Sequence, residues 1–429
     1  MVDPHADELG NVMTGATTTT PEQAEPGFRL PLPERFFARS NPFDPPPALV
    51  EEAGTTPVTE IVHGGKPIWL VTGHAEARAV LSDTRFSSDL RRLITRMDDL
   101  TEEQKADFLS EESSAGSFIS MDPPDHTRYR KLLTGQFTVR RMRVLEPRIA
   151  EIVDEHIDAM LAGGTSADLV PAFALPVPSL VICELLGVPY GRRAEFQEST
   201  ARLLRLNVPI DELLRERDRI QDFMRDLITA KRAAPGDDLL SGLITDSDLT
   251  DNELVNIANL LLIAGHETTA NMLALGTFAL LEHPAELARL RDDPSLADRA
   301  VEELLRHLSI VHAGPTRTAT EDIEVGGTVI PAGATVMVSV PAANRDGGQW
   351  PDPDALDLAR ERGPHLAFGH GVHQCLGQQL ARVEMTIGFT KLLARLPGLR
   401  LDTAAADVPL RTDMAIYGVH ALPVAWDAP

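Results

Sequence analysis

The spacing of apolar residues predicts a chain made largely of helices. Apolar residues recur at helical spacing in four segments that Gly or Pro residues separate, namely 149–162, 173–186, 192–206 and 210–232. Strands are fewer and shorter. Apolar runs at 58–62 and 68–71 flank a Gly-Gly turn and predict a β-hairpin, and short alternating segments follow at 323–325, 328–330 and 334–340. Residues 86–120 have weak periodicity, and such a long irregular segment is typical of a lid or binding loop.

One predicted helix is much longer than the others. Thr250 and Glu253 form a capping box, and helical sequence continues to about Glu282, where His283-Pro284 ends it. A helix of this length spans roughly 45 Å, enough to cross a domain. Its middle, residues 264–269, reads Ala-Gly-His-Glu-Thr-Thr, a poor choice for a helix interior. This conflict indicates either a tolerated polar patch or a functional distortion.

A single cysteine stands out in residues 368–377, which read Phe-Gly-His-Gly-Val-His-Gln-Cys-Leu-Gly. Gly369 and Gly371 allow tight backbone conformations and close approach to a flat ligand. Cys375 comes directly before a predicted helix, whose N-terminus lowers a thiol pKa and stabilises the thiolate. A thiolate held in this way is a plausible axial ligand for haem iron. The plainer alternative is a small buried residue, which is the usual role of a free cysteine.

The ten-residue segment resembles the haem-binding loop of cytochrome P450, Phe-Gly-x-Gly-x-His-x-Cys-x-Gly, at every fixed position. The resemblance implies that Cys375 binds the iron of haem b. It assigns the rest of the loop's cofactor contacts to Phe368, Gly369, Gly371, His373 and Gly377.

The middle of the long helix resembles the oxygen-binding signature of the same family, Ala/Gly-Gly-x-Asp/Glu-Thr-Thr. The resemblance implies that Thr268 hydrogen-bonds the bound oxygen and that Glu267 relays protons from water. Dioxygen activation needs two protons delivered without flooding the site. Small Ala264 and Gly265 would leave room for dioxygen, and the orientation of His266 is left open.

Further basic residues match the family's partners for the haem propionates. His126 and Arg130 share one helix face, and Arg317 and His373 complete the set by resemblance. Cationic donors suit carboxylates, although an isolated pair of this kind is more often a solvated polar face.

A second motif precedes the cysteine loop. Glu303 and Arg306 form Glu-x-x-Arg, and Arg360 lies where the family places a third member. Alone the motif is a weak surface ion pair. The resemblance implies a structural lock that supports the cysteine loop.

The composition limits the cellular locations and the classes of partner that are expected for the protein. Lys and Arg number 40 against 64 Asp and Glu, a net charge of −24, which argues against nucleic acid or an anionic membrane as the main partner. The two cysteines, Cys183 and Cys375, lie far apart and fit a reducing cytoplasm. The apolar stretch 260–264 is far too short to span a membrane. Residues 1–27, acidic and Thr-rich, predict a disordered tail without a secretion signal.

Against this acidic background one segment is basic, with a single nearby acid, Glu146. Its cations are Arg128, Arg130, Lys131, Arg140, Arg141, Arg143 and Arg148. A charge run is usually a solvated face. In the resembling fold, however, this segment borders the thiolate side of the haem, so an acidic ferredoxin is a candidate partner.

The resemblance covers residues 28–429. Within it, the sequence is particularly similar to soluble actinobacterial enzymes, for example in Leu-Leu-Ile-Ala-Gly-His-Glu-Thr-Thr-Ala at 261–270. It implies one large domain, mainly α with a smaller β region. It also implies a monomeric monooxygenase that uses O2 and NAD(P)H electrons relayed by ferredoxin reductase and ferredoxin. The expected reaction is hydroxylation or epoxidation of an apolar small molecule such as a macrolide, terpenoid, steroid, statin-like compound or xenobiotic.

Two other functions stay open, a peroxide-driven haem-thiolate peroxygenase and a non-enzymatic haem sensor or ligand carrier. The intact Glu267-Thr268 pair argues against the first, and the lack of a regulatory domain argues against the second. Substrate choice is expected to lie in 86–120 and 203–210, with 311–314 and 414–417 lining the pocket. Arg91 and Arg92 are candidate partners of an acidic substrate.

Overall fold

The computed structural model describes residues 32–95, 97, 100–206 and 208–428. The tail predicted at 1–27 lies outside the described residues. The helices of seven residues or more are α1 Pro47–Ala53, α2 His74–Ser82, α4 Glu102–Phe108, α6 Asp125–Thr134, α7 Val139–Gly163, α8 Pro176–Leu186, α9 Arg193–Leu203, α10 Ile210–Ala233, α11 Leu239–Asp246, α12 Asp251–Glu282, α13 Pro284–Asp292, α14 Ala297–Leu308 and α16 Gln378–Arg395. Within the described part of the chain, no helix combines the length and apolar character that crossing a membrane requires.

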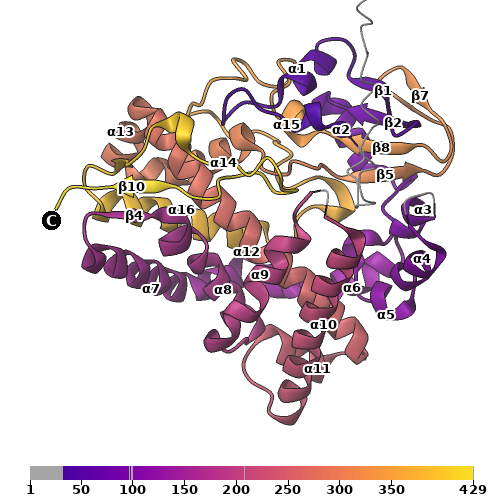
Figure 1. The fold of residues 1–429 in the computed structure, drawn as a ribbon, viewed down its shortest axis with the longest axis horizontal. Helices are drawn as coiled ribbons and strands as arrows, with labels where there is room; N and C mark the ends of the chain where they lie inside the picture. The colour runs from indigo at the N-terminus through magenta and orange to yellow at the C-terminus, as the bar shows by residue number, and fades with distance from the viewer. Residues whose placement is uncertain (1–31, 96, 98–99, 207, 429) are drawn as a thin grey trace, which may run out of the picture.

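Strands are short; most of them lie at one end of the molecule, and a smaller group lies on the opposite side, near the C-terminus (Figure 1). They are β1 Val58–His63, β2 Lys66–Val71, β3 Phe86–Ser87, β4 Ser166–Asp168, β5 Thr316–Ala319, β6 Ile323–Val325, β7 Thr328–Ile330, β8 Thr335–Val338, β9 Arg400–Leu401 and β10 Pro423–Ala425. The main sheet has the order β1-β2-β8-β5-β3, and β2 runs parallel to β8. The hairpin predicted at 58–71 is confirmed, with Val58 opposite Val71. The fold is therefore mainly α with a smaller β region, as predicted.

Helix α12 begins where the sequence predicts. The hydroxyl of Thr250 accepts a hydrogen bond from the backbone N–H of Glu253 at 3.3 Å, and the Glu253 carboxylate accepts one from the N–H of Thr250 at 2.7 Å. The helix continues without interruption through 264–269. The conflict in local propensity there is therefore resolved by burial of the helix rather than by a break in it.

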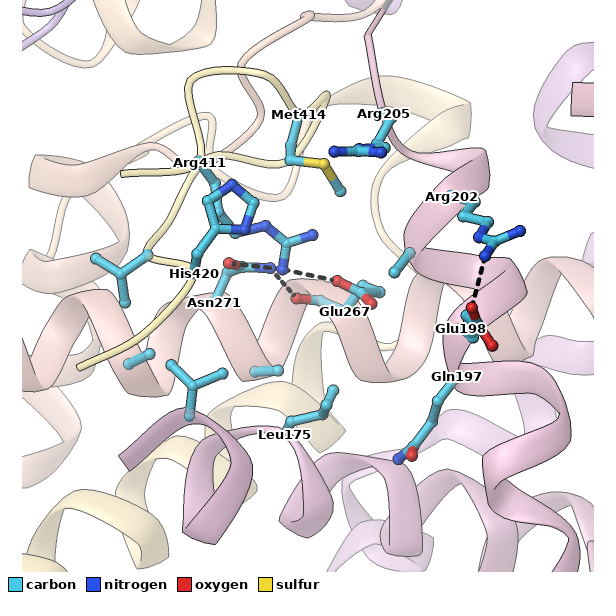
Figure 2. A pocket seen from close by; sticks show the side chains of 15 residues that line it. Leu175, Gln197, Glu198, Arg202, Arg205, Glu267, Asn271, Arg411, Met414 and His420 are labelled. Atoms are coloured by element: carbon cyan, nitrogen blue, oxygen red, sulfur yellow. Dashed lines mark hydrogen bonds and ion pairs between the residues drawn. The ribbon is translucent and has the colours of Figure 1, made fainter. Parts of the chain in front are cut away.

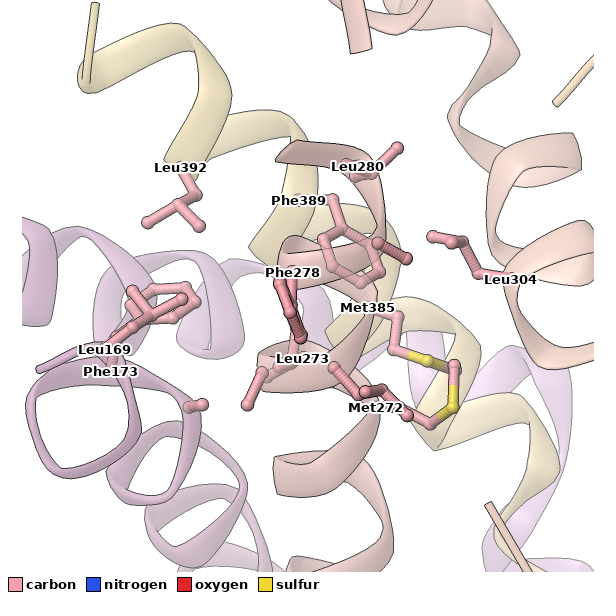
Figure 3. Packing of buried hydrophobic residues seen from close by; sticks show 14 of the residues in the cluster. Leu169, Phe173, Met272, Leu273, Phe278, Leu280, Leu304, Met385, Phe389 and Leu392 are labelled. Carbon is pink, nitrogen blue, oxygen red and sulfur yellow. The ribbon is translucent and has the colours of Figure 1, made fainter. Parts of the chain in front are cut away.

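The largest hydrophobic cluster packs around the C-terminal half of α12. Phe278 of α12 and Phe389 of α16 are fully buried there, beside Phe173 and residues of α7, α8 and α14 (Figure 3). A side chain at Gly276 would meet the Phe389 ring at 2.6 Å, so the glycine lets α16 lie close to α12. The cysteine loop leads directly into α16, so this contact fixes its position relative to α12.

Two predicted segments differ from the observed ones. Helix α7 begins at Val139, ten residues before the predicted start, and contains Pro147. Its buried face runs from Met142 across the proline to Ile149, so tertiary packing outweighs the cost of proline in the helix. The irregular region 86–120 contains β3, α4 and two short helices, α3 Leu90–Ile94 and α5 Glu111–Ser114.

We expect Phe389→Ala to lower the free energy of unfolding by about 3–5 kcal/mol, because it removes a buried ring and leaves a cavity between α12 and α16. Urea denaturation of the purified protein measures this loss. Val144→Ala on α7, at a side chain that is 75% exposed, is the matched control and should stay within about 0.5 kcal/mol. Equal losses in the two variants would contradict the central place of Phe389.

Candidate active site

A rigid loop presents Cys375. Gly369 and Gly371 have φ values of 68° and 73°, in the left-handed region that favours glycine. A Cβ at Gly371 would also collide with the backbone of Leu81 in α2. The N–H of Cys375 donates to the carbonyl of Phe368 at 2.8 Å and closes the loop. Both glycines therefore meet backbone requirements, as the sequence indicated.

The electrostatics of Cys375 differ from the prediction in direction. Burial raises the pKa of the thiol, while the N–H groups of Gly377 and Gln378 and the guanidinium groups of Arg130 and Arg382 act to lower it. The helix N-terminus thus works as expected, but burial outweighs it. A metal cation at the sulfur would compensate this cost, since coordinating thiols are deprotonated.

A basic cluster lies beside the loop, formed by His126, Arg130, Arg317 and His373. The rings of His126 and His373 have centroids 4.2 Å apart. Arg130 donates through Nη2 to the carbonyl of Gln374, and Arg317 on β5 donates to the neighbouring carbonyl of Thr316 at 2.9 Å. The structure therefore brings together the four predicted propionate partners from separate segments.

The basic cluster has no hydrogen-bonded carboxylate among the described residues. His126 is only 2% exposed, yet neither of its ring nitrogens has a partner there. Burial lowers the pKa of His126, Arg130 and Arg317, and burial together with the neighbouring cations lowers that of His373 to about 3. The carboxylate of Asp122 lies close to Arg317, but it already accepts hydrogen bonds from the hydroxyl of Ser87 and the backbone N–H of Ser88. Such a site suits a dianionic group, and haem carries two carboxylates.

Helix α12 contributes an accessible face. Ala264 is exposed and Thr268 half-buried in a helix that is otherwise mostly buried, and the Thr268 hydroxyl donates to the Ala264 carbonyl at 2.8 Å. Gly265 has a packing role that the sequence did not indicate, because a Cβ there would lie 2.8 Å from Ile182 of α8.

Glu267 is 2% exposed and engages a partner that sequence reasoning missed. Its Oε2 lies 3.1 Å from Nη1 of Arg411, which also donates to Oδ1 of Asn271 at 3.3 Å (Figure 2). His266 also lies near this carboxylate, with its Nε2 3.8 Å from Oε1 of Glu267, and it hydrogen-bonds the carbonyl of Leu262 at 2.7 Å and the hydroxyl of Thr200 at 3.1 Å. Arg411 belongs to no motif, so no sequence signal could have identified it.

The Glu-x-x-Arg residues meet as the resemblance implied. The carboxylate of Glu303 accepts from Nε and Nη2 of Arg306 at 2.8 Å each and from Nε of Arg360 at 3.1 Å. Arg306 is 1% exposed and also donates to backbone carbonyls of Asn344, Pro353 and Ala355. These bonds tie α14 to the segment that leads into the cysteine loop.

A second network in the same region was not predicted. Glu302 contacts Nε2 of His365 at 3.0 Å and Nη2 of Arg382 at 3.1 Å. Burial raises the pKa of Glu302, but these partners lower it to about 2. The Arg382 guanidinium lies 4.5 Å from the centre of the Phe368 ring, so the network supports the first residue of the cysteine loop.

In the structure, the cations of the predicted basic segment differ in whether they form ion pairs. Arg128 is paired with Glu253 and Asp248, and Arg148 with three glutamates. Arg140, Arg141 and Arg143 have no ion-pair partner in the described part of the chain. Of the candidate substrate arginines, Arg91 is held by Asp89 at 2.7 Å and is therefore committed to a local pair.

We expect Glu303→Gln to lower the free energy of unfolding by about 3–5 kcal/mol, because it leaves the buried guanidinium of Arg306 without its anion. Denaturant titration measures the loss. The matched control is Asp222→Asn, which removes the exposed partner of Arg225 and should cost less than about 1 kcal/mol. A loss for Glu303→Gln as small as that of the control would contradict the lock.

Comparison with known proteins agrees with this geometry. The family model "Cytochrome P450" matches residues 53–397. The chain is 47% identical to cytochrome P450-SU2 of Streptomyces griseolus over 95% of this chain and 100% of the relative, and 47% identical to pentalenic acid synthase of Streptomyces avermitilis over 94% and 100%.

Solved structures show the same relationship. Rif16 is 57% identical with a TM-score of 0.80, covering 92% of this chain and 100% of that one. CYP105P1 in complex with filipin I is 45% identical with a TM-score of 0.85, covering 91% and 98%. The predicted family and fold are confirmed: the chain belongs to the cytochrome P450 family of monooxygenases.

Proposed function

We propose that Cys375 is the axial ligand of haem b and that His126, Arg130, Arg317 and His373 bind its propionates. The observation that carries the proposal is the basic cluster itself, in which His126 and Arg317 are buried and no member has a carboxylate hydrogen-bond partner among the described residues. When bound, haem b supplies the redox chemistry that activates dioxygen. The loop glycines Gly369, Gly371 and Gly377 would let the backbone approach the flat cofactor. Phe368, at the start of the loop, would contribute a side chain to the same site.

The residues of α12 would deliver protons to the reacting oxygen and leave space for it beside the helix. Thr268 and Ala264 form the accessible patch of the helix, so the Thr268 hydroxyl is placed to hydrogen-bond oxygen there. Glu267, the residue before Thr268, is a buried carboxylate that can pass protons toward that hydroxyl. The buried surroundings keep bulk water away from the reacting atoms. This intact pair supports a dioxygen-dependent reaction over a peroxide-driven one.

The substrate we propose is an apolar small molecule of secondary metabolism, hydroxylated or epoxidised at carbon. Relatives named for their reactions include pentalenic acid synthase and vitamin D3 dihydroxylase. Among similar structures, one is a complex with filipin I and another is a methyl hydroxylase bound to mycinamicin VIII. A macrolide, terpenoid, steroid, statin-like compound or xenobiotic fits this range.

For electron supply we propose an acidic ferredoxin served by an NAD(P)H-ferredoxin reductase. Arg140, Arg141 and Arg143 on α7 are exposed cations without an ion-pair partner among the described residues, and Val144 beside them is 75% exposed. Unpaired charge next to exposed apolar surface favours transient docking of an acidic protein. We further propose that the protein works as a monomer in the cytoplasm; its two free cysteines suit the reducing conditions of that compartment.

We expect the dithionite-reduced protein to give, with carbon monoxide, the Soret band for which the family is named. Cys375→Ala should lose that band, because no other thiol lies in the cysteine loop. Cys183→Ala is the matched control, since Cys183 is buried in α8 and should leave the band unchanged. A histidine-type band in the wild type would overturn the proposal that Cys375 binds the iron.

We expect the double reversal Arg140→Glu/Arg141→Glu to raise the apparent KM for ferredoxin by about tenfold at low salt, with a smaller effect at high salt. Steady-state electron transfer from reduced ferredoxin measures it. Arg35→Glu/Arg291→Glu changes the net charge equally at exposed sites on other elements. If both double variants raised the apparent KM equally, the effect would come from overall charge, and the proposal that ferredoxin docks at Arg140, Arg141 and Arg143 would be wrong.

A further inference from the structure

Helix α6 carries two of the proposed propionate partners, so its position decides where they lie. Its buried residues are His126, Tyr129 and Leu133, which are spaced at helical intervals and share one face. Arg130 follows Tyr129 directly in the chain. Whatever holds Tyr129 in place therefore also sets the positions of His126 and Arg130.

Tyr129 is held by Glu253, an acid in the first turn of α12. The hydroxyl of Tyr129 donates to Oε1 of Glu253 at 2.7 Å, and the two residues are only 6% and 7% exposed. Burial and this hydrogen bond raise the pKa of Tyr129, so the phenol keeps the proton that it donates. Arg128, which precedes Tyr129 on α6, contacts the same carboxylate oxygen. Both contacts join α6 to the start of α12.

The carboxylate of Glu253 is itself fixed, because it forms half of the capping box of α12. Its Oε2 accepts the backbone N–H of Thr250 at 2.7 Å and the hydroxyl of Thr250 at 3.0 Å, which leaves Oε1 for α6. Burial raises the pKa of Glu253, but its bonds to Thr250, Arg128 and Tyr129 lower it to about 2, so the carboxylate is ionised near neutral pH. One carboxylate therefore both caps α12 and holds α6.

The segment before α6 packs tightly against the same turn of α12. Gly116 has a φ of 84°, and a Cβ there would lie 2.5 Å from the carbonyl oxygen of Glu253. Nearly one turn further along α12, Nδ2 of Asn256 donates to the carbonyls of Glu112 at 2.8 Å and Ala115 at 2.7 Å. The first turn of α12 is therefore a fixed point against which α6 is held.

The basic cluster tends to push α6 away. Besides burial, Arg130 lowers the pKa of His126, and burial together with His126, Arg317 and Arg130 lowers that of His373. These shifts show that the members of the cluster disfavour one another's positive charge. Glu253 supplies α6 with an anion outside the cluster, so the helix is held without neutralising the donors that the propionates need.

We propose that Tyr129 and Glu253 are positioning residues for the cofactor, which hold α6 against α12 so that His126 and Arg130 face the propionates. The proposal rests on the propionate role of His126 and Arg130 proposed above. Donors that are already in place bind a ligand more tightly, because less ordering is needed on binding. The same hydrogen bond also relates the propionate donors to the accessible patch further along α12.

The test is the rate at which the haem-loaded protein loses its cofactor to excess apomyoglobin, followed by Soret absorbance. Tyr129→Phe removes only the hydroxyl and should raise this rate about tenfold, because a hydrogen bond to a charged group is lost. With haem dimethyl ester, whose carboxylates are blocked, the substitution should leave the rate unchanged, which a general loosening of the fold would not do. Tyr190→Phe is the matched control, since its hydroxyl accepts from Arg148 at 3.2 Å, and should change neither rate.

A second substitution tests the acceptor. Glu253→Gln keeps a residue that suits a capping box but removes the charge, and it should raise the rate of haem loss by a similar factor. The double variant Tyr129→Phe/Glu253→Gln should lose haem no faster than the faster single variant, because both changes act on the same hydrogen bond. A wild-type rate in Tyr129→Phe, equal rises with haem and its ester, or additive effects in the double variant would each overturn the proposal.

Arg130→Gln separates this proposal from the propionate role on which it rests. The substitution should raise the rate of haem loss more than the rate of ester loss, because only haem offers a carboxylate to Arg130. Equal rises in the two rates would show that the propionate role itself is wrong. The expected result for Arg130→Gln, together with a wild-type rate for Tyr129→Phe, would count only against the positioning role of Tyr129 and Glu253.

Discussion

The structure depends on keeping a group of buried and partly buried basic side chains free of acidic partners. His126, Arg130, Arg317 and His373 come from three parts of the chain, α6, β5 and the cysteine loop, and they meet beside Cys375 without a carboxylate hydrogen-bonded to any of them among the described residues. Burial disfavours the charged form of these groups, and the two arginines have no anionic partner, so a dianionic cofactor would stabilise the site. The rest of the fold has to hold these groups apart from the 64 acids of the chain.

Two acids of α14 support the cysteine loop beside this cluster: Glu303, which is buried, and Glu302, which is partly buried. Glu303 binds Arg306 and Arg360 and so fixes the segment before the loop, while Glu302 binds His365 and Arg382 and so fixes its first residue through Phe368. Adjacent residues of α14 therefore support the loop from two directions. Because their cations are partly or fully buried, these pairs act as rigid connections and not as exchangeable surface contacts.

Helix α12 serves different purposes along its length and around its axis. Its C-terminal half packs Phe278 and Gly276 into the core against α16. Its middle presents Ala264 and Thr268 on one face and turns Glu267 toward Arg411 on another. Because α12 is continuous, it fixes the distance between the core contact with α16 and the accessible patch at Ala264 and Thr268.

The sequence by itself determined what is encoded locally: the capping box of α12, the hairpin at 58–71, the glycines of the cysteine loop and the family motifs that nominate Cys375, Glu303 and Thr268. These depend on neighbouring residues, so their spacing is visible in the chain. Tertiary structure alone decided which partner each charge takes: Arg411 for Glu267, Arg382 for Glu302, and no partner among the described residues for Arg140 and Arg141. Ion pairs between residues 80 and 144 positions apart leave no periodic trace in the sequence. Burial, which also outweighs the helix N-terminus at Cys375, is a property of the packed fold.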